Sequence, residues 1–286
     1  MCKGRRKLIF TELKGGIGNQ LFIIAAALQQ ARRLKTKLIL IPSFNLRDAH
    51  ARLLFRKTSL PADVVLAPRI SHSPRLADKM KQMHPNVFRE SSHDYDPAIW
   101  NISNDTWLTG YFQSHKYFPE ILPEIVQMVN REAVSRNLPQ LKDLAELRLA
   151  TGLHVRMGDY LAPKNRKLIG VLGNDYYKAA LKSRNQEPSM ESSIHLFSDS
   201  PGMAYARRIH TGLKLESDLD PLLSFIRLSS CGKLILSNSS FSLWAAYFAD
   251  LNGAEIAAPN KWYFGASKEV KDIFYTKWTR FENTFE

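Results

Sequence analysis

The stretch Gly152-Leu153-His154-Val155-Arg156-Met157-Gly158-Asp159-Tyr160 decides how the second half of this chain folds. Its first part, Leu153-His154-Val155, is a short apolar and β-branched run, which predicts a buried strand. Gly158 lets the chain turn sharply at the end of that strand. A histidine, an arginine and a carboxylate therefore leave a single strand end close together.

These three side chains suit an anionic ligand. Arg156 offers a rigid fork of N–H donors that matches a phosphate, Asp159 is a candidate base, and His154 can donate or accept a hydrogen bond. In open α/β sheets ligands bind beyond the carboxyl ends of the strands, where this cluster is predicted to lie. The residues alone also allow a plainer interpretation, a strand with a surface salt bridge at its tip.

Three predicted strands in the second half end in polar clusters. The clusters are His154, Arg156 and Asp159; Ser198, Asp199 and Ser200; and Asn238, Ser239 and Ser240. Because the carboxyl ends of parallel strands share one edge of a sheet, we expect these residues to converge. Their convergence indicates a ligand site more strongly than any single cluster does.

The first half opens with a strand, a glycine turn, a helix and a strand. Residues 8–10 and 37–42 are predicted strands, 14–20 a glycine-rich turn and about 19–34 a helix, the opening of a Rossmann-like unit. The turn lacks the third glycine of the dinucleotide fingerprint and the Gly-Lys-Ser/Thr of a P-loop. Its glycines still leave backbone N–H groups free to approach an anion. Asn19 fits a helix cap and a ligand contact equally well.

Periodicity and capping signals predict the other elements. Residues 43–104 contain only short apolar runs, and helical periodicity over 119–150, broken near Leu138-Pro139, places a domain boundary within 139–150. The predicted domains are 1–146 and 147–286. The further predicted elements are a strand at 106–112, a basic loop at 163–168, helices from Asn174, from a Ser200 cap and from Asp220, strands at 194–197, 233–236 and 255–259, a helix at 241–250 and a C-terminal amphipathic helix at 268–286.

Composition indicates a soluble globular protein. Of the 286 residues, 44% are hydrophobic and 23% charged, and no apolar run approaches the roughly 20 residues of a membrane span. The basic start is followed by an apolar run that breaks at Thr11-Glu12, too early for a signal peptide. Cys2 and Cys231 alone provide neither a disulfide framework nor a zinc site. A reducing cytoplasm is the expected compartment.

The formal net charge of +13, from 40 Lys and Arg against 27 Asp and Glu, suits nucleic acid, an anionic membrane surface or a polyanionic small substrate. The charge is spread along the chain, and the sequence contains no zinc finger or RNA-recognition signature. The histidines lack metal-ligand spacing. Asp218-Leu219-Asp220 precedes a predicted helix, where capping explains it more simply than a metal site.

Five motifs resemble those of the α-1,2-fucosyltransferases, glycosyltransferase family 11, in the family's order. They are Gly15-Gly16-Ile17-Gly18-Asn19-Gln20-Leu21-Phe22, Gly110-Tyr111-Phe112-Gln113-Ser114-His115-Lys116-Tyr117-Phe118, the stretch from His154 to Tyr160, Phe197-Ser198-Asp199, and Asn238-Ser239-Ser240-Phe241-Ser242-Leu243-Trp244. Together they cover most of the chain and leave 43–104 weakly matched.

The resemblance implies a GT-B-like α/β fold with two Rossmann-like domains facing a cleft, residues 1–146 on the acceptor side and 147–286 on the GDP-sugar side. It implies inverting transfer of L-fucose from GDP-β-L-fucose to the 2-hydroxyl of a galactose residue, an α-1,2 linkage, without a metal. The implied partners are GDP-fucose and a galactose-terminated glycan or lipid-linked oligosaccharide of polysaccharide biosynthesis, and no nucleic acid.

The resemblance also implies residue roles. Arg156 would neutralise the charge on the departing β-phosphate. Asp159 would take the acceptor proton or hold Arg156 in place. The implied donor-binding residues are Gly16, Gly18, Asn19, Gln20, His154, Asp199, Asn238, Ser239 and Ser240, with His154 and Asp199 at the nucleoside end.

Two positions depart from the family pattern. Met157 stands where a second arginine is usual, which removes one phosphate contact, and Leu243-Trp244 replaces paired tryptophans. Three alternatives stay open: a transferase of another GDP-sugar or linkage, a relative that binds without turnover, and a basic nucleic-acid-binding protein. The expected absence of an N-terminal membrane anchor agrees with a cytoplasmic bacterial protein. So does the sequon at Asn238, because glycosylation of a residue in the donor site would block that site. The positive charge of the protein would also allow peripheral contact with an anionic membrane.

Overall fold

A computed structural model describes residues 8–42, 53–67, 82, 86–139, 141–184, 193–217, 219–264 and 272–286. The chain forms two compact units, Met1–Arg136 and Asn137–Glu286. Each unit contains one sheet with parallel strands, so the predicted α/β class is confirmed. The GT-B arrangement of the two units about a cleft stays a prediction.

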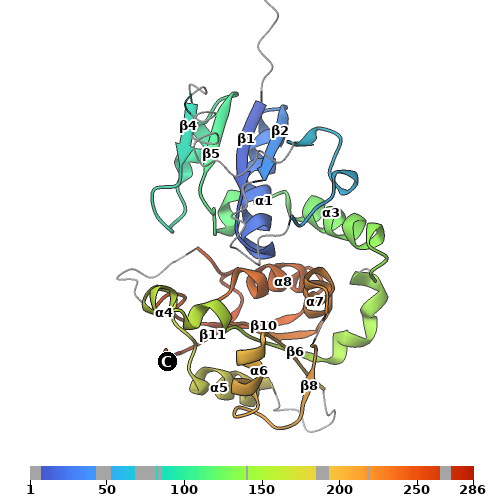
Figure 1. Ribbon diagram of the computed structural model, residues 1–286, viewed down its shortest axis with the longest axis vertical. Helices are drawn as coiled ribbons and strands as arrows, with labels where there is room; N and C mark the ends of the chain where they lie inside the picture. The colour runs from blue at the N-terminus through green and yellow to red at the C-terminus, as the bar shows by residue number, and fades with distance from the viewer. Residues whose placement is uncertain are drawn as a thin grey trace, which may run out of the picture. The chain divides into compact units, whose positions relative to one another are not determined.

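The first unit is built on a five-stranded sheet in the order β3-β2-β1-β5-β4 (Figure 1). All of its strand pairs are parallel. The strands are β1 (Leu8–Leu13), β2 (Lys37–Pro42), β3 (Val64–Leu66), β4 (Asn86–Arg89) and β5 (Thr106–Thr109). The helices are α1 (Ile17–Arg33) and α3 (Leu122–Ser135), with short 3₁₀ turns at Lys57–Ser59, Pro97–Asn101 and His115–Tyr117.

Helix α1 is central to this unit because its sequence is apolar around most of its circumference. Residues 20–31 are all buried, as expected for a helix packed between a sheet and other elements. The helix begins after Gly16, which occupies the cap position without a side-chain bond. Asn19 lies inside the first turn, so the interpretation of Asn19 as the helix cap is wrong.

The second unit has a six-stranded sheet in the order β11-β10-β9-β6-β7-β8. All of its strand pairs are parallel. The strands are β6 (Thr151–Val155), β7 (Ile194–Ser198), β8 (Leu213–Leu215), β9 (Lys233–Ile235), β10 (Glu255–Pro259) and β11 (Thr279–Phe281). Counted along the unit this is the doubly wound order of a Rossmann fold, and its topological switch point lies between β6 and β9.

Helices cover both faces of the second sheet. Figure 1 shows α7 and α8 on one face and α5 and α6 on the other. The helices are α4 (Pro163–Leu168), α5 (Asn174–Arg184), α6 (Ser200–Ala206), α7 (Pro221–Ser229) and α8 (Ser240–Asp250). Because both faces are covered, β6, β7 and β10 are almost wholly buried, in accordance with their continuous apolar runs.

The structure corrects several boundaries. The units divide after Arg136, earlier than the predicted boundary after residue 146, because the segment η4 (Leu141–Leu149) joins the second unit. There the carbonyl of Leu147 accepts from the backbone N–H of Gly232 at 3.2 Å. The periodicity over 119–150 is thus α3 followed by a 3₁₀ segment. The predicted basic loop at 163–168 is the short helix α4, which has proline in its first turn.

The predicted C-terminal helix is wrong for residues 272–286; residues 265–271 lie outside the described part. Thr279–Phe281 pairs as strand β11 with β10. Ile273, Phe274 and Trp278 are buried, and the indole N–H of Trp278 donates to Asp250 at 2.8 Å. Helical spacing of aromatic residues indicates only that one side is buried, and here pairing at the sheet edge outweighs the helical propensity.

Within the described ranges, no helix is both long enough and apolar enough to cross a membrane.

Candidate functional site

The second unit gathers most of the predicted site residues at its topological switch point. Strand β6 ends at Val155 and β9 at Ile235, and the two strands are neighbours. The chain leaves β6 through Arg156, leaves β9 through Ser237 and Asn238, and leaves β7, on the other side of β6, through Asp199. The predicted convergence of the three polar clusters is therefore confirmed at the level of the fold, at the edge where ligands of such sheets bind.

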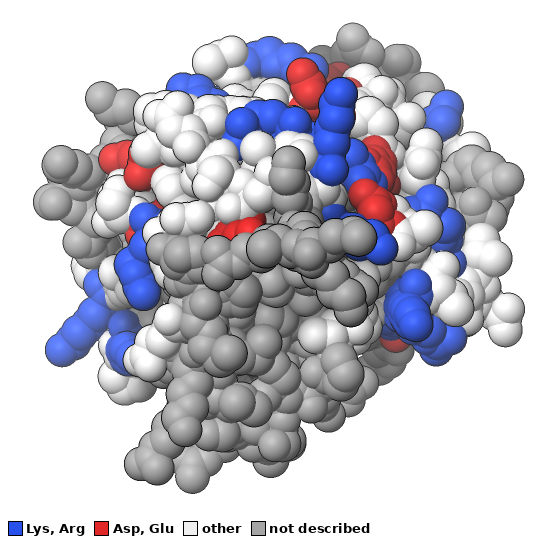
Figure 2. Space-filling view, turned by 90° about the horizontal axis from the view of Figure 1, so that it is seen from above, with Lys and Arg blue, Asp and Glu red and all other residues white. Residues whose placement is uncertain are grey.

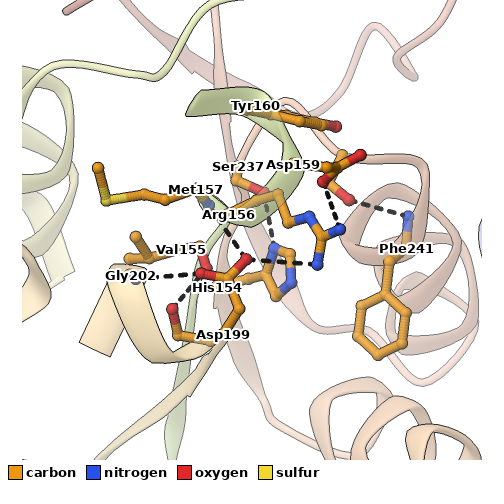
Figure 3. A network of polar contacts seen from close by, with 12 residues as sticks. His154, Val155, Arg156, Met157, Asp159, Tyr160, Asp199, Gly202, Ser237 and Phe241 are labelled. Atoms are coloured by element: carbon orange, nitrogen blue, oxygen red, sulfur yellow. Dashed lines mark hydrogen bonds and ion pairs between the residues drawn. The ribbon is translucent and has the colours of Figure 1, made fainter. Parts of the chain in front are cut away.

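Arg156 is held between two carboxylates. Its Nη2 donates to Asp159 Oδ1 at 2.5 Å, and its Nη1 lies 3.3 Å from Asp199 Oδ2 (Figure 3). The guanidinium also lies over the ring of Tyr160, 5.8 Å from its centre. The Arg156 side chain is 23% exposed, so it is oriented by its neighbours and still accessible to a ligand.

Asp199 ties the ends of β6 and β7 together. Its Oδ1 accepts from the backbone N–H of Gly202 at 3.0 Å and so caps α6, and its Oδ2 accepts from the N–H of Met157 at 3.3 Å. The predicted Ser200 cap is thus displaced by one residue, because the longer Asp side chain reaches the first turn from the position before it.

Two glycines allow this close approach. A Cβ on Gly158 would lie 2.8 Å from Asp199 Oδ2, and one on Gly202 would lie 2.1 Å from Ser198 Oγ. A side chain at Gly158 would therefore displace the carboxylate that orients Arg156, and one at Gly202 would displace Ser198 and crowd Asp199 Oδ1 at 3.1 Å.

His154 is buried on β6, 6% exposed, and shares a 2.6 Å hydrogen bond between Nδ1 and Ser237 Oγ. Its ring stacks on Phe241 with centroids 5.3 Å apart. Burial, and secondarily the charge of Arg156, lower the pKa of His154 from 6.5 to about 3. The imidazole is therefore neutral at physiological pH and joins β6 to β9 through Ser237.

This lowered pKa makes a testable prediction about stability. The unfolded chain binds a proton at His154 below pH about 6.5, whereas the folded chain does so only near pH 3. Stability should therefore fall as pH decreases through this window, by roughly 1.4 kcal/mol per unit. The variant His154→Asn keeps a polar group at the Nδ1 position. Between about pH 7.5 and pH 5 we expect its free energy of unfolding, measured in urea, to fall by about 2 kcal/mol less than that of the wild type. His210→Asn, at a partly exposed histidine, is the control; an unchanged pH dependence in His154→Asn would contradict the assignment.

The polar cluster after β9 has two different roles. The amide nitrogen of Asn238 donates to the carbonyls of Ile169, Gly170 and Trp262 at 3.1–3.2 Å, and the residue is 2% exposed. Its amide nitrogen thus joins the end of β9 to two other backbone segments, and glycosylation of this sequon would remove one of the two N–H donors and disrupt these bonds. Ser239 caps α8 through its hydroxyl, and Ser240 is the partly exposed first residue of that helix. The start of α8 thus presents backbone N–H groups at the switch point.

Met157, the departure from the family pattern, is partly buried. Its side chain packs against the apolar cluster that contains Leu153 and Val155, and its backbone contacts the site, since its N–H donates to Asp199 Oδ2. An arginine here would place a charge against this cluster. Trp244 is buried and meets Tyr247 and Phe248 edge to face.

The predicted donor-binding residues of the first unit lie at the carboxyl end of β1 and the start of α1. Gly15 adopts φ 73°, which favours glycine, and a Cβ on Gly16 would meet no described atom within 4 Å. Gln20 is buried: its Nε2 donates to the Gly15 carbonyl at 2.9 Å, and its Oε1 accepts from the N–H of Leu54 at 3.0 Å. Gln20 therefore shapes the glycine turn from within. Two others share this region: Gly18 is buried, and Asn19 Oδ1 accepts from Gln113 Nε2 at 2.9 Å.

The sequence did not single out Ser237 or Tyr160 as site residues. Ser237 bonds His154, and the Tyr160 hydroxyl donates to the carbonyl of Asn238 at 3.1 Å. Burial is the main cause that raises the pKa of Tyr160 to about 12, so it stays a hydrogen-bond donor. Tyr160 is the last residue of one motif and Ser237 directly precedes another, but their roles depend on contacts across some 80 positions of the chain.

Among the described residues, no group of three His, Cys, Asp or Glu side chains could hold a metal ion. Asp220 caps α7 by accepting from the N–H groups of Leu222 and Leu223; Asp218 lies outside the described part. Figure 2 shows one face, on which Lys and Arg stand in several separate groups with Asp and Glu among them.

Comparison with curated proteins finds relatives along nearly the whole chain. O-antigen biosynthesis glycosyltransferase WbnK of Escherichia coli is 25% identical over 91% of this chain and 96% of that protein. An alpha-1,2-colitosyltransferase of Escherichia coli is 20% identical over 96% and 99%. Galactoside alpha-(1,2)-fucosyltransferase 1 of Oryctolagus cuniculus is 27% identical over 82% of this chain and 62% of that protein.

Solved structures resemble the chain more distantly. Fucosyltransferase NodZ from Bradyrhizobium aligns over 84% of this chain and 92% of that chain, with a TM-score of 0.47 and 13% identity. Heptosyltransferase WaaC of E. coli with ADP aligns over 96% and 90%, with a TM-score of 0.45 and 8% identity.

The family relationship rests on the sequence itself. The model of glycosyl transferase family 11 matches residues 2–282, a range that contains all five motifs and every residue of the switch-point cluster. This confirms the predicted resemblance. The chain belongs to glycosyltransferase family 11.

Proposed function

We propose that this protein transfers L-fucose from GDP-β-L-fucose to the 2-hydroxyl of a galactose residue on a glycan, with inversion at the anomeric carbon. The observation that carries the proposal is the guanidinium of Arg156, accessible and oriented by two carboxylates at the switch point of the second unit. Such a fork suits a diphosphate. The proposed sugar and linkage are those in the name of the relative galactoside alpha-(1,2)-fucosyltransferase 1.

In the proposed reaction the acceptor oxygen attacks the anomeric carbon from the face opposite the GDP. The bond from that carbon to the β-phosphate oxygen breaks, and the acceptor hydroxyl loses its proton to a base. Negative charge therefore grows on the β-phosphate as GDP departs. Arg156 and the N–H groups at the start of α8 would stabilise this charge because they are already oriented before the reaction begins.

The two carboxylates beside Arg156, Asp159 and Asp199, make different contacts. Asp159 Oδ1 is bonded to Arg156, and its side chain is 46% exposed, which supports a role in positioning the guanidinium. To act as the general base while keeping that bond, Asp159 would have to accept the proton on its other oxygen, Oδ2. Asp199 uses one oxygen to cap α6 and the other to orient Arg156 and Met157, so we propose that it positions the site rather than binding the nucleoside.

The remaining assignments follow from the same geometry. We propose that Gly16, Gly18, Asn19 and Ser240 contact the donor, whereas the buried Gln20, Asn238 and His154 maintain the backbone around it. We further propose that the reaction needs no metal and takes place in the cytoplasm, where the basic protein attaches peripherally to an anionic membrane bearing a lipid-linked acceptor.

The test is release of the nucleoside diphosphate, followed in parallel for GDP-fucose, GDP-mannose and UDP-galactose, with lactose or N-acetyllactosamine as acceptor and with chelator present. We expect release that depends on the acceptor with GDP-fucose, and much less with the other two donors. Release with GDP-mannose in preference would indicate another GDP-sugar. Binding of GDP without release would indicate a relative without turnover.

A second candidate comes from the charge of the chain. A nucleic-acid-binding protein would bind duplex or single strands with strong salt dependence, and GDP would not affect that binding. We expect no such binding at physiological salt, because the described basic side chains in Figure 2 are interrupted by acidic ones.

A further inference from the structure

Three polar or aromatic side chains lie at the carboxyl edge of the sheet of the first unit, outside the glycine turn. In the order β3-β2-β1-β5-β4, strands β1 and β5 are neighbours although β2, β3 and β4 lie between them in the sequence. Lys14 follows β1, Tyr111 follows β5 and Glu90 follows β4, so all three leave the carboxyl ends of adjacent parallel strands. Ligands of open α/β sheets bind beyond this edge.

The turn after β5 is strained. Phe112 adopts φ 56°, a left-handed conformation that is unfavourable for a bulky residue. Its side chain is fully buried, stacked on Phe88 with centroids 6.4 Å apart and edge-on to Tyr117 at 5.3 Å. Strain of this kind persists where the surroundings over-determine it, and it concentrates at functional sites.

Glu90 holds this strained turn. Its Oε2 accepts from the backbone N–H of Tyr111 at 2.8 Å and from that of Phe112 at 3.1 Å. A Cβ on Gly110 would lie 2.6 Å from Glu90 Cβ, so only glycine permits this approach. Burial raises the pKa of Glu90 even though both N–H groups favour its charged form.

The result of the strained turn is an outward-facing aromatic ring. Tyr111 is 36% exposed, whereas its neighbour Phe112 is buried. Lys14 Nζ lies 4.5 Å from the centre of the Tyr111 ring and supports it from one side. Gln113 ties the same turn to the first turn of α1 through Asn19. The side chain is thus exposed on a rigid support, which is typical of a binding platform.

We propose that Tyr111 and Glu90 form a subsite for one neutral sugar ring of the glycan acceptor, the ring stacking on Tyr111 and one of its hydroxyls donating to the Glu90 carboxylate. This inference rests on the proposed function. A sugar suits the pair because it offers an apolar C–H face to an aromatic ring and hydroxyl donors to a carboxylate, which only accepts. A role of Glu90 confined to supporting the turn would need its oxygen but not its charge.

That difference defines the test. In Glu90→Gln the amide oxygen can still accept from both N–H groups, so the turn survives while the charge is lost. We expect the KM for N-acetyllactosamine to rise roughly 10-fold or more, since a hydrogen bond to a charged acceptor is lost, and the KM for GDP-fucose to change less than about 2-fold. Tyr111→Leu should raise the acceptor KM roughly 5-fold, and Tyr111→Phe should stay near the wild type.

Asp105→Asn is the matched control. It removes the same charge at the amino end of β5, the opposite edge of the sheet, at φ 63°, which Asn tolerates. Unchanged acceptor KM in Glu90→Gln and Tyr111→Leu would overturn the inference and leave the proposed function standing. The inference would also be overturned if the KM for the donor and the KM for the acceptor rose together while the melting temperature fell. Saturation-transfer NMR with N-acetyllactosamine tests the subsite without turnover. If Glu90→Gln and Tyr111→Leu both abolish binding of the sugar, the subsite is supported even in a protein that releases no GDP. If binding persists in both variants, the inference is overturned.

Discussion

Arg156→Ala is expected to lower kcat for GDP release at least about 100-fold, the scale of removing one charge-stabilising donor from a preorganised site. The variant removes the guanidinium and also leaves the carboxylates of Asp159 and Asp199 without the cation between them. The loss should appear in kcat, because the charge on the departing phosphate is greatest in the transition state.

Arg156→Lys separates charge from geometry. Lysine keeps the positive charge but cannot hold a bidentate contact and two carboxylates at once, so we expect an intermediate loss of roughly 10-fold. Arg166→Ala is the control, because Arg166 is an exposed arginine on α4. If Arg156→Ala retained activity within a factor of about 3 of Arg166→Ala, the proposed role of Arg156 would be wrong.

Asp199→Ala is expected to lower both stability and activity, and a matched position allows the two effects to be separated. Asp199 caps α6 and Asp220 caps α7, in each case with proline in the first turn. Loss of either cap should cost about 1 kcal/mol in urea unfolding. Only Asp199→Ala should also lower kcat, roughly 10-fold or more, because only Asp199 orients Arg156 and the N–H of Met157.

Asp199→Asn refines this comparison. Asparagine caps helices as well as aspartate does, so stability should stay near that of the wild type, whereas the ion pair with Arg156 is lost and kcat should still fall. Equal stability losses in Asp199→Ala and Asp220→Ala, with full activity in both, would show that Asp199 acts only as a helix cap.

Long and strongly patterned elements could be predicted from the sequence. β1, β2, β6, β7 and α8 lie where apolar runs, glycine turns and capping residues indicate, because these signals act between residues close in the chain. The short strands β3, β4, β8 and β11 were missed. Each has three or four residues and lies at or beside a sheet edge, so it depends on backbone pairing with a neighbour more than on its own propensity.

Part of the site was predictable from the order of the strands along the chain. His154, Arg156, Asp199 and Ser239 could be named because polar residues at the ends of parallel strands meet at one edge of the sheet. Their individual roles could not, since a side chain's partner is invisible in the sequence. Asn238 resembled a ligand contact, yet its side chain is buried and its amide nitrogen donates to three carbonyls from two other segments.

The sequence by itself determined which residues stand at the ends of strands, and through five ordered motifs it determined the family. Only the tertiary structure decided which of those ends are neighbours. The switch point exists because β9 pairs with β6 instead of with β8, which precedes it along the chain. That pairing brings Ser237 to His154 across 83 positions of sequence. The pairing of distant strands depends on the whole sheet, because the strand order must bury both of its faces. No local pattern of residues encodes that order.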